Sequence, residues 1–282
     1  MSFILGVDTG GTYTDAVILE DEERVIAFSK ALTTHSDLSL GIGSAIQKAV
    51  KQRNTAPEKI SLVSLSTTLA TNALVEGQGD RVALVMIGFQ DSDLEKHAIF
   101  DALKGDPFLV IEGGHNYAGF EKNPLEKNKL SRWISEIKCV SAYAVCSQFA
   151  VRNPEHELEA AEIIRKLTDK PVSLSHQISA KLNGPKRALT AVLNARLIAL
   201  IDLLIIKAEH VIKSLGILAP LMVVRGDGAL ISAAQAREKP IETILSGPAA
   251  SIVGAQWLTG ETEAIISDIG GTTTDIAVLK GG

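Results

Sequence analysis

The sequence predicts an α/β fold. Apolar stretches of strand length alternate along the chain with longer stretches of helical spacing, as in a sheet covered by helices. The 282 residues are 46% hydrophobic but only 4% aromatic and include 23 glycines, a composition typical of aliphatic strands joined by tight turns. An eight-residue motif also occurs twice, near the two ends of the chain. At roughly 150 residues per domain, this length fits about two domains.

The expected elements follow the chain in order. The apolar positions of 37–53 recur at three- and four-residue spacing, which indicates a helix. Asn153 is expected to cap a helix to 167 that has proline at its first position, and Gly216 is expected to end a long helix at 186–215. Strands are expected at 3–8, 13–19, 24–30, 60–65, 81–87, 139–145, 171–174 and 221–224, and further helices at 67–76, 125–137 and 232–238. Residues 88–124 are expected to be mainly loop, and a hairpin is expected at 264–279.

Charge and composition exclude several classes of protein. The chain carries 28 Lys and Arg against 33 Asp and Glu, so it lacks the clustered positive charge of a nucleic-acid binder. Asn194, Arg196, Asp202, Lys207 and Glu209 interrupt its most apolar stretch, at 188–212, which argues against a membrane span. No signal peptide is apparent at the N-terminus. Two cysteines, Cys139 and Cys146, suit reduced thiols in a cytoplasmic protein.

The repeated motif predicts two equivalent β-hairpins. Residues 8–15 read Asp-Thr-Gly-Gly-Thr-Tyr-Thr-Asp and residues 268–275 read Asp-Ile-Gly-Gly-Thr-Thr-Thr-Asp, so six of eight positions match. Strand-type runs flank each copy, and a Gly-Gly pair permits the positive φ values of tight hairpin turns. If the first turn centres between Gly11 and Thr12, Asp8 and Asp15 face each other on one side of the sheet.

Facing carboxylates repel one another unless a cation or backbone donors compensate. Mg²⁺ relies on one or two carboxylates plus substrate phosphates, so a candidate metal site arises here. Its candidate ligands are the four motif carboxylates, Asp8, Asp15, Asp268 and Asp275. The turn N–H groups and threonine hydroxyls are expected to cradle phosphate oxygens. The candidate phosphate-binding residues are Gly10, Gly11, Thr12, Gly270, Gly271, Thr272 and Thr273.

One copy alone is equally consistent with an ordinary Gly-Gly turn. Two copies favour two related lobes that present the same turn to one phosphate chain. The motifs resemble those of the actin, sugar kinase and Hsp70 ATPase superfamily. The closing Thr-Asp, the stretch 66–74 (STTLATNAL) and the stretch 246–250 (SGPAA) resemble the A-type subunit of the hydantoinase/5-oxoprolinase family.

The resemblance implies a ribonuclease H-like fold of mixed sheets in two lobes. A family N-terminal domain would occupy 1–182, and the start of an ATPase domain would occupy 183–282, with the second lobe incomplete. It also implies ATP and Mg²⁺ as cofactors, ATP-dependent hydrolysis of a cyclic amide such as a hydantoin or 5-oxoproline, and a B-type partner subunit. A homo-oligomer is compatible with the sequence. The alternatives are a metabolite kinase, a ketone carboxylase ATPase subunit and a non-catalytic nucleotide-binding module.

Three further groups of residues are candidates. Thr67, Thr68 and Asn72 follow a strand, where they would either line a substrate pocket or cap a helix. Ser246 and Gly247 begin a helix and would either bind an anion or form a plain cap. Asp227 lies between glycines, as a catalytic base or a structural turn residue. Asp8 and Asp268 are the other candidate catalytic residues.

Overall fold

The computed structural model describes residues 2–77, 79–95, 98–271 and 273–281. The chain forms two compact units. Unit 1 comprises Met1–Gly77 and Ile201–Gly282, and unit 2 comprises the intervening Gln78–Leu200. This structural division differs from the linear split at 182 and 183 expected for the family domains, because unit 2 is inserted into the chain of unit 1.

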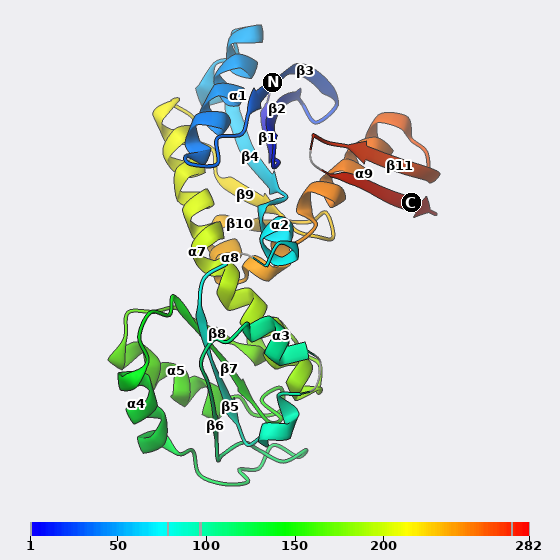
Figure 1. The fold of residues 1–282 in the computed structure, drawn as a ribbon. Helices are drawn as coiled ribbons and strands as arrows, with labels where there is room; N and C mark the ends of the chain where they lie inside the picture. The colour runs from blue at the N-terminus through cyan, green and yellow to red at the C-terminus, as the bar shows by residue number, and fades with distance from the viewer. Residues whose placement is uncertain (1, 78, 96–97, 272, 282) are drawn as a thin grey trace. The chain divides into compact units, whose positions relative to one another are not determined.

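Unit 1 contains a six-stranded mixed sheet (Figure 1). Its strands, in sheet order, are β10 (Leu230–Ser232), β9 (Leu221–Val224), β4 (Ile60–Thr67), β1 (Phe3–Thr9), β2 (Tyr13–Glu20) and β3 (Arg24–Leu32). Strands β1, β2 and β3 form an antiparallel meander, and β4 runs parallel to both β1 and β9. The carboxyl ends of β1 and β4 therefore meet at one edge of the sheet.

Besides the second part of the long helix α7 (Gly184–Ser214), unit 1 contains further helices and a separate hairpin. They are α1 (Leu38–Arg53), η1 (Pro57–Lys59), α2 (Leu69–Val75), α8 (Ala233–Glu238), η4 (Pro240–Thr243), α9 (Ser246–Thr259) and a hairpin of β11 (Glu263–Ile269) and β12 (Thr274–Lys280). The expected periodicity of α1 is confirmed, since Ile42, Ala45 and Ile46 are fully buried or nearly so. Asp37 caps this helix by accepting the Ser39 N–H at 3.2 Å.

Burial alternates along β1 and β2. Leu5, Val7 and Ala16 lie on the buried face, on which α1 packs along β2 and β3. Asp8 and Asp15 fall on the opposite, partly exposed face. Because side chains alternate across a strand, the pattern that buries the aliphatic residues also presents both carboxylates on the open side of the sheet.

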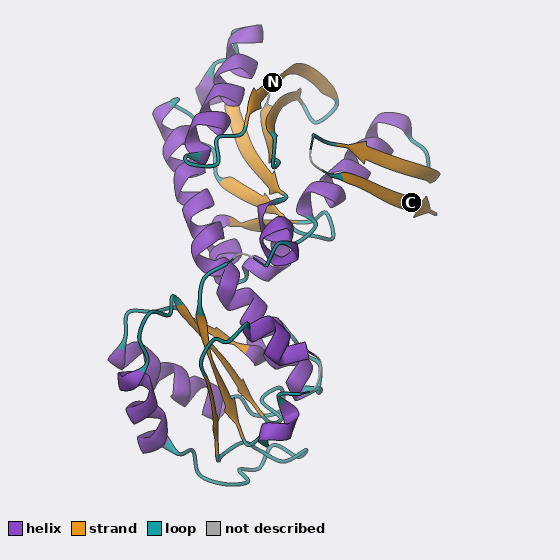
Figure 2. Cartoon of the chain, viewed as in Figure 1, coloured by secondary structure: helices purple, strands orange, loops and turns teal. Residues whose placement is uncertain are grey.

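Unit 2 contains a parallel four-stranded sheet with helices on both faces (Figure 2). The strands, in sheet order, are β6 (Phe108–Ile111), β5 (Val82–Ile87), β7 (Ala142–Ser147) and β8 (Val172–Leu174). Its other elements are η2 (Asp91–Asp93), α3 (Ile99–Leu103), α4 (Lys127–Glu136), α5 (Glu155–Leu167), α6 (Ser175–Ile178) and the first part of α7 (Gly184–Ser214). Every residue of β5 and β7 is buried, as expected for strands covered on both sides.

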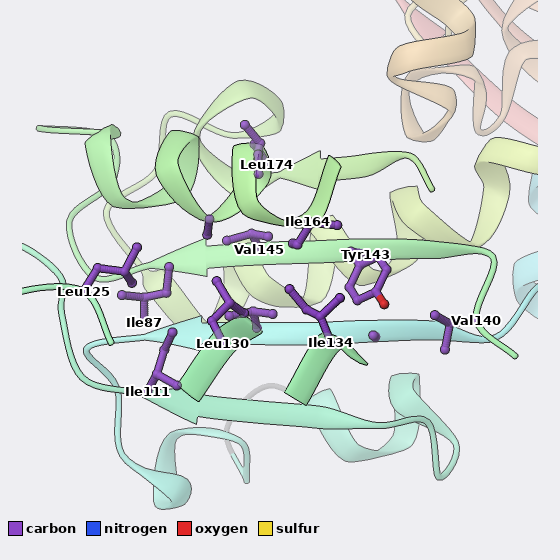
Figure 3. Packing of buried hydrophobic residues seen from close by; sticks show 14 residues of the cluster. Ile87, Ile111, Leu125, Leu130, Ile134, Val140, Tyr143, Val145, Ile164 and Leu174 are labelled. Carbon is purple, nitrogen blue, oxygen red and sulfur yellow. The ribbon is translucent and has the colours of Figure 1, made fainter. Parts of the chain in front are cut away.

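The core of unit 2 lies on the two faces of this sheet. Ile87 of β5 packs in one cluster with Leu130 and Ile134 of α4 and Ile164 of α5 (Figure 3). Val85 of β5 belongs to the same cluster. On the other face, alternate residues of the same strands pack against α3 and the start of α7. The segment 88–124, expected to be mainly loop, also contributes α3 and β6.

Among the described residues, one helix is long and apolar enough to cross a membrane. It is α7, with a mean hydropathy of 2.1 over its most apolar window. By length and composition alone this helix passes a test that its polar residues were expected to make it fail, and the core helix of a protein without a membrane span passes the same test. Half of the window is buried inside the protein. The buried Arg187 and Arg196 donate to the carbonyl groups of Ser147 and Leu103 at 2.8 and 2.7 Å, so both charges are satisfied within unit 2.

The expected cap at Asn153 was displaced by one residue. Pro154 occupies the cap position of α5, and the Asn153 side chain accepts the Glu155 N–H at 3.0 Å. The asparagine still satisfies an amide of the first turn, although it stands outside the helix.

We predict that Leu130→Ala destabilises unit 2 by about 2–5 kcal/mol, because it leaves a cavity between α4 and the sheet. Denaturant unfolding measures this change. Leu167→Ala is the matched control, since Leu167 is 51% exposed at the end of α5. Equal losses for both variants would contradict the placement of the core.

Candidate functional site

The first hairpin has the expected register. Asp8 pairs with Asp15 and Thr9 with Thr14, and the Gly10 N–H donates to the Tyr13 carbonyl at 2.9 Å. The turn is therefore centred between Gly11 and Thr12, and the two aspartates share one face of the sheet.

The second hairpin repeats this geometry. Asp268 pairs with Asp275, and the Gly270 N–H donates to the Thr273 carbonyl at 3.0 Å. Residue 272, an expected phosphate-binding threonine, lies outside the described residues. The sequence repeat thus corresponds to a repeat in backbone pairing.

The glycines serve a purpose other than the one expected. Gly10, Gly270 and Gly271 do not adopt positive φ values, so the expectation of left-handed turn residues was wrong for these positions. Instead they permit close approach. A Cβ atom on Gly10 would lie 3.1 Å from the Tyr13 carbonyl oxygen, and one on Gly271 would lie 2.8 Å from Thr12 Oγ1. The tips of the two hairpins therefore lie against each other.

Asp8 lies at the centre of the site. It accepts a hydrogen bond from Ser66 Oγ at 2.6 Å, donated from the carboxyl end of the neighbouring β4. Burial raises the pKa of the Asp8 carboxyl above its ordinary value, and the charges of Asp15 and Asp268 raise the pKa further, against the opposing effect of Ser66. The fold thus places carboxylates close enough to repel one another.

Helix α9 links the two hairpins. The Ser246 hydroxyl in its first turn donates to the Thr67 carbonyl at 2.9 Å and accepts the Thr67 N–H at 3.2 Å. Further along the helix, Ser251 Oγ donates to Asp268 Oδ2 at 2.5 Å. One helix is thereby fixed to the strand beside the first hairpin and to the second hairpin.

The space in front of the hairpins is a pocket of about 440 Å³. All four motif carboxylates contribute to its walls. The described lining residues are Asp8, Gly10, Gly11, Thr12, Tyr13, Asp15, Lys30, Thr68, Asn72, Asp268, Ile269, Gly270, Gly271, Thr273 and Asp275. The structure therefore brings together residues that are up to 267 positions apart in sequence, Asp8 and Asp275 being the extremes.

Lys30 and Tyr13, which were not among the site residues predicted from the sequence, also line the pocket. Lys30 Nζ forms an ion pair with Asp15 at 2.8 Å and lies 4.9 Å from the centre of the Tyr13 ring. Strand register places Lys30 directly opposite Asp15 on β3. No motif marks this lysine, but counting the same hairpin register across to the third strand would have found it.

Several predicted site residues have other contacts. Thr67 is fully buried; its hydroxyl donates to the Thr9 carbonyl at 3.1 Å and accepts the Leu69 N–H at 3.0 Å, so it supports the start of α2. Ser246 was wrongly expected to cap α9. Leu245 holds the cap position, and Ser246 lies inside the first turn. Neither Thr67 nor Ser246 is among the described residues that line the pocket.

Of the two remaining candidate residues, Gly247 lies beside Asp8, whereas Asp227 lies outside the described lining of the pocket. A Cβ atom on Gly247 would lie 3.0 Å from Thr68 Cγ2 and 3.7 Å from Asp8 Oδ1, so this glycine lets α9 approach the carboxylate. Asp227 forms an ion pair with Arg225 at 2.8 Å and accepts the Ala229 N–H at 3.1 Å. It is absent from the described lining of the pocket, and its contacts are those of a turn residue.

Whether the site can hold a metal ion depends on how many carboxylates lie close together. Within the described part of the chain, no group of three or more His, Cys, Asp or Glu side chains is arranged to hold a metal ion by itself. A site for Mg²⁺ with one or two carboxylates, waters and phosphate oxygens needs no such group. Burial raises the pKa of Asp8 and the negative charges of Asp15 and Asp268 raise it further, and a cation beside these carboxylates would relieve the repulsion.

Comparison with known proteins connects this geometry to a family. Residues 4–168 match the hydantoinase/oxoprolinase N-terminal region, and residues 187–282 match the hydantoinase/oxoprolinase domain. The chain belongs to the hydantoinase/oxoprolinase family. The resemblance inferred from the motifs is thereby confirmed.

Two of the relatives are named as enzyme subunits. The chain is 29% identical to caprolactamase subunit alpha of Pseudomonas jessenii, covering 99% of this chain and 43% of that protein. It is 26% identical to the acetophenone carboxylase gamma subunit of Aromatoleum aromaticum, covering 98% of this chain and 42% of that protein. The chain therefore spans less than half the length of these relatives.

A solved structure shares the fold. The crystal structure of the ATP-dependent caprolactamase from Pseudomonas jessenii matches with a TM-score of 0.80 and 25% identity, over 98% of this chain and 43% of that one. The expected architecture of mixed sheets with helices is confirmed.

The raised pKa of Asp8 predicts a pH-dependent stability. Because its pKa is raised from 3.8, the folded protein binds this proton more tightly than the unfolded chain does. Ionised Asp8 therefore destabilises the fold at neutral pH, and this cost disappears as the pH falls below 3.8. We expect Asp8→Asn, whose side-chain oxygen can still accept from Ser66, to raise the melting temperature at neutral pH and to lose that advantage in acid.

Thermal unfolding between pH 3 and pH 8 measures this difference. Asp169→Asn, on the exposed surface of unit 2, is the control and should show no such trend. A melting temperature that Asp8→Asn lowers at neutral pH would contradict the account of Asp8.

Proposed function

We propose that the two hairpins of unit 1 hold the phosphate chain of ATP with Mg²⁺, and that the complete protein uses this ATP to open a cyclic amide. The observation that carries the proposal is the pairing of two equivalent hairpins, with Asp8 and Asp268 in equivalent positions, around one pocket. A ligand with repeated, chemically similar groups suits such a repeated site. A polyphosphate is a ligand of that kind.

The residues present fit a phosphate chain. Gly10, Gly11 and Gly270 bring backbone close to the pocket without side chains in the way, and Thr12 and Thr273 add hydroxyl groups at the turns. Asn72 and Thr68, which form a 3.5 Å contact between Asn72 Nδ2 and Thr68 Oγ1, supply further polar groups on the wall that α2 contributes. Adenosine need not bind to these elements.

The negative charge of the pocket means that ATP would need a cation in order to bind there. Four carboxylates and one lysine line the described pocket, and ATP would bring further negative charge. Mg²⁺ between Asp8, Asp268 and the phosphates would offset this repulsion. Lys30 would then move from its ion pair with Asp15 toward a phosphate oxygen, because an exposed ion pair of this kind contributes little, about 0–1 kcal/mol.

The chemistry follows from what ATP supplies. Transfer of its terminal phosphoryl group to the carbonyl oxygen of an amide would release ADP and leave a carbon that water can attack. The hairpin residues would position the phosphates and neutralise the charge that develops on them. Water would then open the ring with release of phosphate.

The relatives support this choice of substrate. A relative with 29% identity is named a caprolactamase subunit, and a solved relative is an ATP-dependent caprolactamase. The second candidate is an ATPase subunit of a ketone carboxylase, which the 26% identity to an acetophenone carboxylase subunit favours. Because both relatives are named as subunits, we also propose that a partner subunit, of the B type that the family resemblance implies, completes the enzyme.

The direct test is ATP hydrolysis by the full-length protein with its partner subunit. We expect a cyclic amide, either a hydantoin, 5-oxoproline or a lactam, to stimulate Mg²⁺-dependent hydrolysis, and Asp268→Asn to abolish that stimulation. Asp169→Asn is the matched control. Stimulation only by a ketone with bicarbonate would favour the carboxylase, and stimulation by no substrate would reject both functions.

A further inference from the structure

Unit 2 contains a pair of buried histidines to which the proposed function gives no role. His115 follows β6, and His156 lies in the first turn of α5. Both side chains are buried, and the centres of their rings lie 4.5 Å apart. Neither residue is among the described residues that line the hairpin pocket. The pair therefore needs an explanation other than ATP binding.

Hydrogen bonds fix the protonation state of His156. Its Nδ1 atom accepts the Gly114 N–H at 2.8 Å, so this nitrogen carries no proton. Its Nε2 atom lies 3.1 Å from Glu121 Oε1, to which the neutral ring donates. A second proton on the ring would go to Nδ1, where it would face the Gly114 N–H. Protonation of His156 therefore breaks the bond to Gly114.

His115 is less able still to take up a proton in place. It is fully buried, and neither of its ring nitrogens has a hydrogen-bond partner among the described residues. A protonated ring would present two N–H donors and a positive charge to these surroundings. A buried charge without such partners is costly. The neutral ring is therefore the form that fits this place.

Charged groups from two elements act on His115. They are His156 and Glu155 of α5, and Glu121 of the segment that follows β6, while β7 contributes the Gln148 carbonyl, which accepts the His115 main-chain N–H at 3.2 Å. Burial lowers the pKa of the His115 imidazole below its ordinary value of 6.5, and His156 lowers this pKa further, against the opposing effect of the two glutamates. Two positively charged rings at the observed separation would repel one another.

The segment 113–122 is held on the sheet by the same contacts. A Cβ atom on Gly113 would lie 3.2 Å from His156 Nδ1, so the main chain packs directly on this ring. The main-chain N–H groups of Gly114 and His115 donate to α5 and to the end of β7. Loss of the bond to His156 would therefore free the side of the segment that faces α5.

The tip of this segment presents two aromatic rings to solvent. Tyr117 and Phe120 are 79% and 72% exposed. The Asn116 side-chain oxygen fixes the turn between them, because it accepts the N–H groups of Ala118 and Phe120 at 2.9 and 3.1 Å. The turn is thus ordered by its own contacts, so a movement of the segment at the histidines would carry both aromatic rings with it.

We propose that His115 and His156 form an acid-sensitive switch, in which two neutral rings hold the segment 113–122 on the sheet and uptake of a proton by the pair releases it. In the released segment both imidazoles reach water, which solvates the charged form. The turn with Tyr117 and Phe120 then leaves its place at the carboxyl end of the sheet. The switch lies within unit 2 and does not depend on the proposed function.

Acid shifts the equilibrium toward the open segment. Because the pKa of His115 is lowered in the closed form, the open form binds a proton there more tightly. The closed form therefore loses stability as the pH falls below 6.5. One proton taken up on opening shifts the equilibrium by up to about tenfold per pH unit.

The test is hydrogen exchange of the main-chain amides of 113–122 in the whole chain at pH 7.5 and pH 5.5, corrected for the chemical exchange rate at each pH. We expect the protection of these amides to fall several-fold, and by up to about tenfold, at the lower pH. Protection of the amides of β5, which serves as the internal reference, should not change.

Two variants remove the titrating groups. His115→Phe keeps a buried ring without nitrogens, and the side-chain oxygen of His156→Asn can accept the Gly114 N–H but takes up no proton. Both should keep the segment protected at pH 5.5. His35→Phe, which replaces an exposed histidine of unit 1, is the matched control and should respond to pH as the parent does.

An NMR titration of the imidazole ring protons in the unaltered chain provides a readout that does not depend on the folding of a variant. Titration of His115 at or above 6.5 while the segment stays protected would overturn the proposal, because the closed form would then accept the proton freely. Unchanged protection of the parent at pH 5.5 would also overturn it. An equal loss of protection in the parent and in both variants would do the same, since other groups would then cause the opening.

Discussion

The site of unit 1 depends on the attachment of α9 to the end of β4. Ser246 donates to and accepts from the backbone of Thr67, and both residues are fully buried. About five residues further along the helix, or roughly 7.5 Å at the usual rise per residue, Ser251 contacts Asp268. Because one helix makes both contacts, the second hairpin is placed opposite the first, and Gly271 meets Thr12 at their tips. Without this attachment the sequence repeat would remain two unconnected hairpins.

The same arrangement explains why carboxylates and glycines recur in the motif. Pairing in register puts two aspartates on one face of each hairpin, and burial with neighbouring negative charge raises the pKa of Asp8. Such crowding disfavours the empty fold and favours a cation with its ligand. The glycines keep side chains away from the turns, so that backbone groups of both hairpins reach the same space. The close approach of the carboxylates thus both destabilises the fold and favours binding of a metal-bound phosphate chain.

Much of this was predictable from the sequence, because local periodicity determines it. The hairpin register follows from the positions of Asp8 and Asp15 alone, and the amphipathic face of α1 follows from its spacing. The role of Ser246 was not predictable, since its hydroxyl bonds the backbone of Thr67, 179 positions away. Nor was that of Thr67, whose hydroxyl bonds the carbonyl of Thr9 on the neighbouring strand. Lys30 joins the pocket only through strand pairing with Asp15. The insertion of unit 2 could not be predicted without knowing which strands are neighbours.

The central claim is that Asp8 and Asp268 serve one metal-bound phosphate chain. A double-mutant cycle of Asp8→Asn and Asp268→Asn, read out as the affinity of the full-length protein for Mg²⁺-ATP, tests it most directly. Residues that act on one ligand ion are coupled, whereas distant independent sites are additive within about 0.3–0.5 kcal/mol. The account predicts that the double variant binds no more weakly than the weaker single variant. Additive losses would contradict it, because they would mean that the two hairpins act on separate ligands.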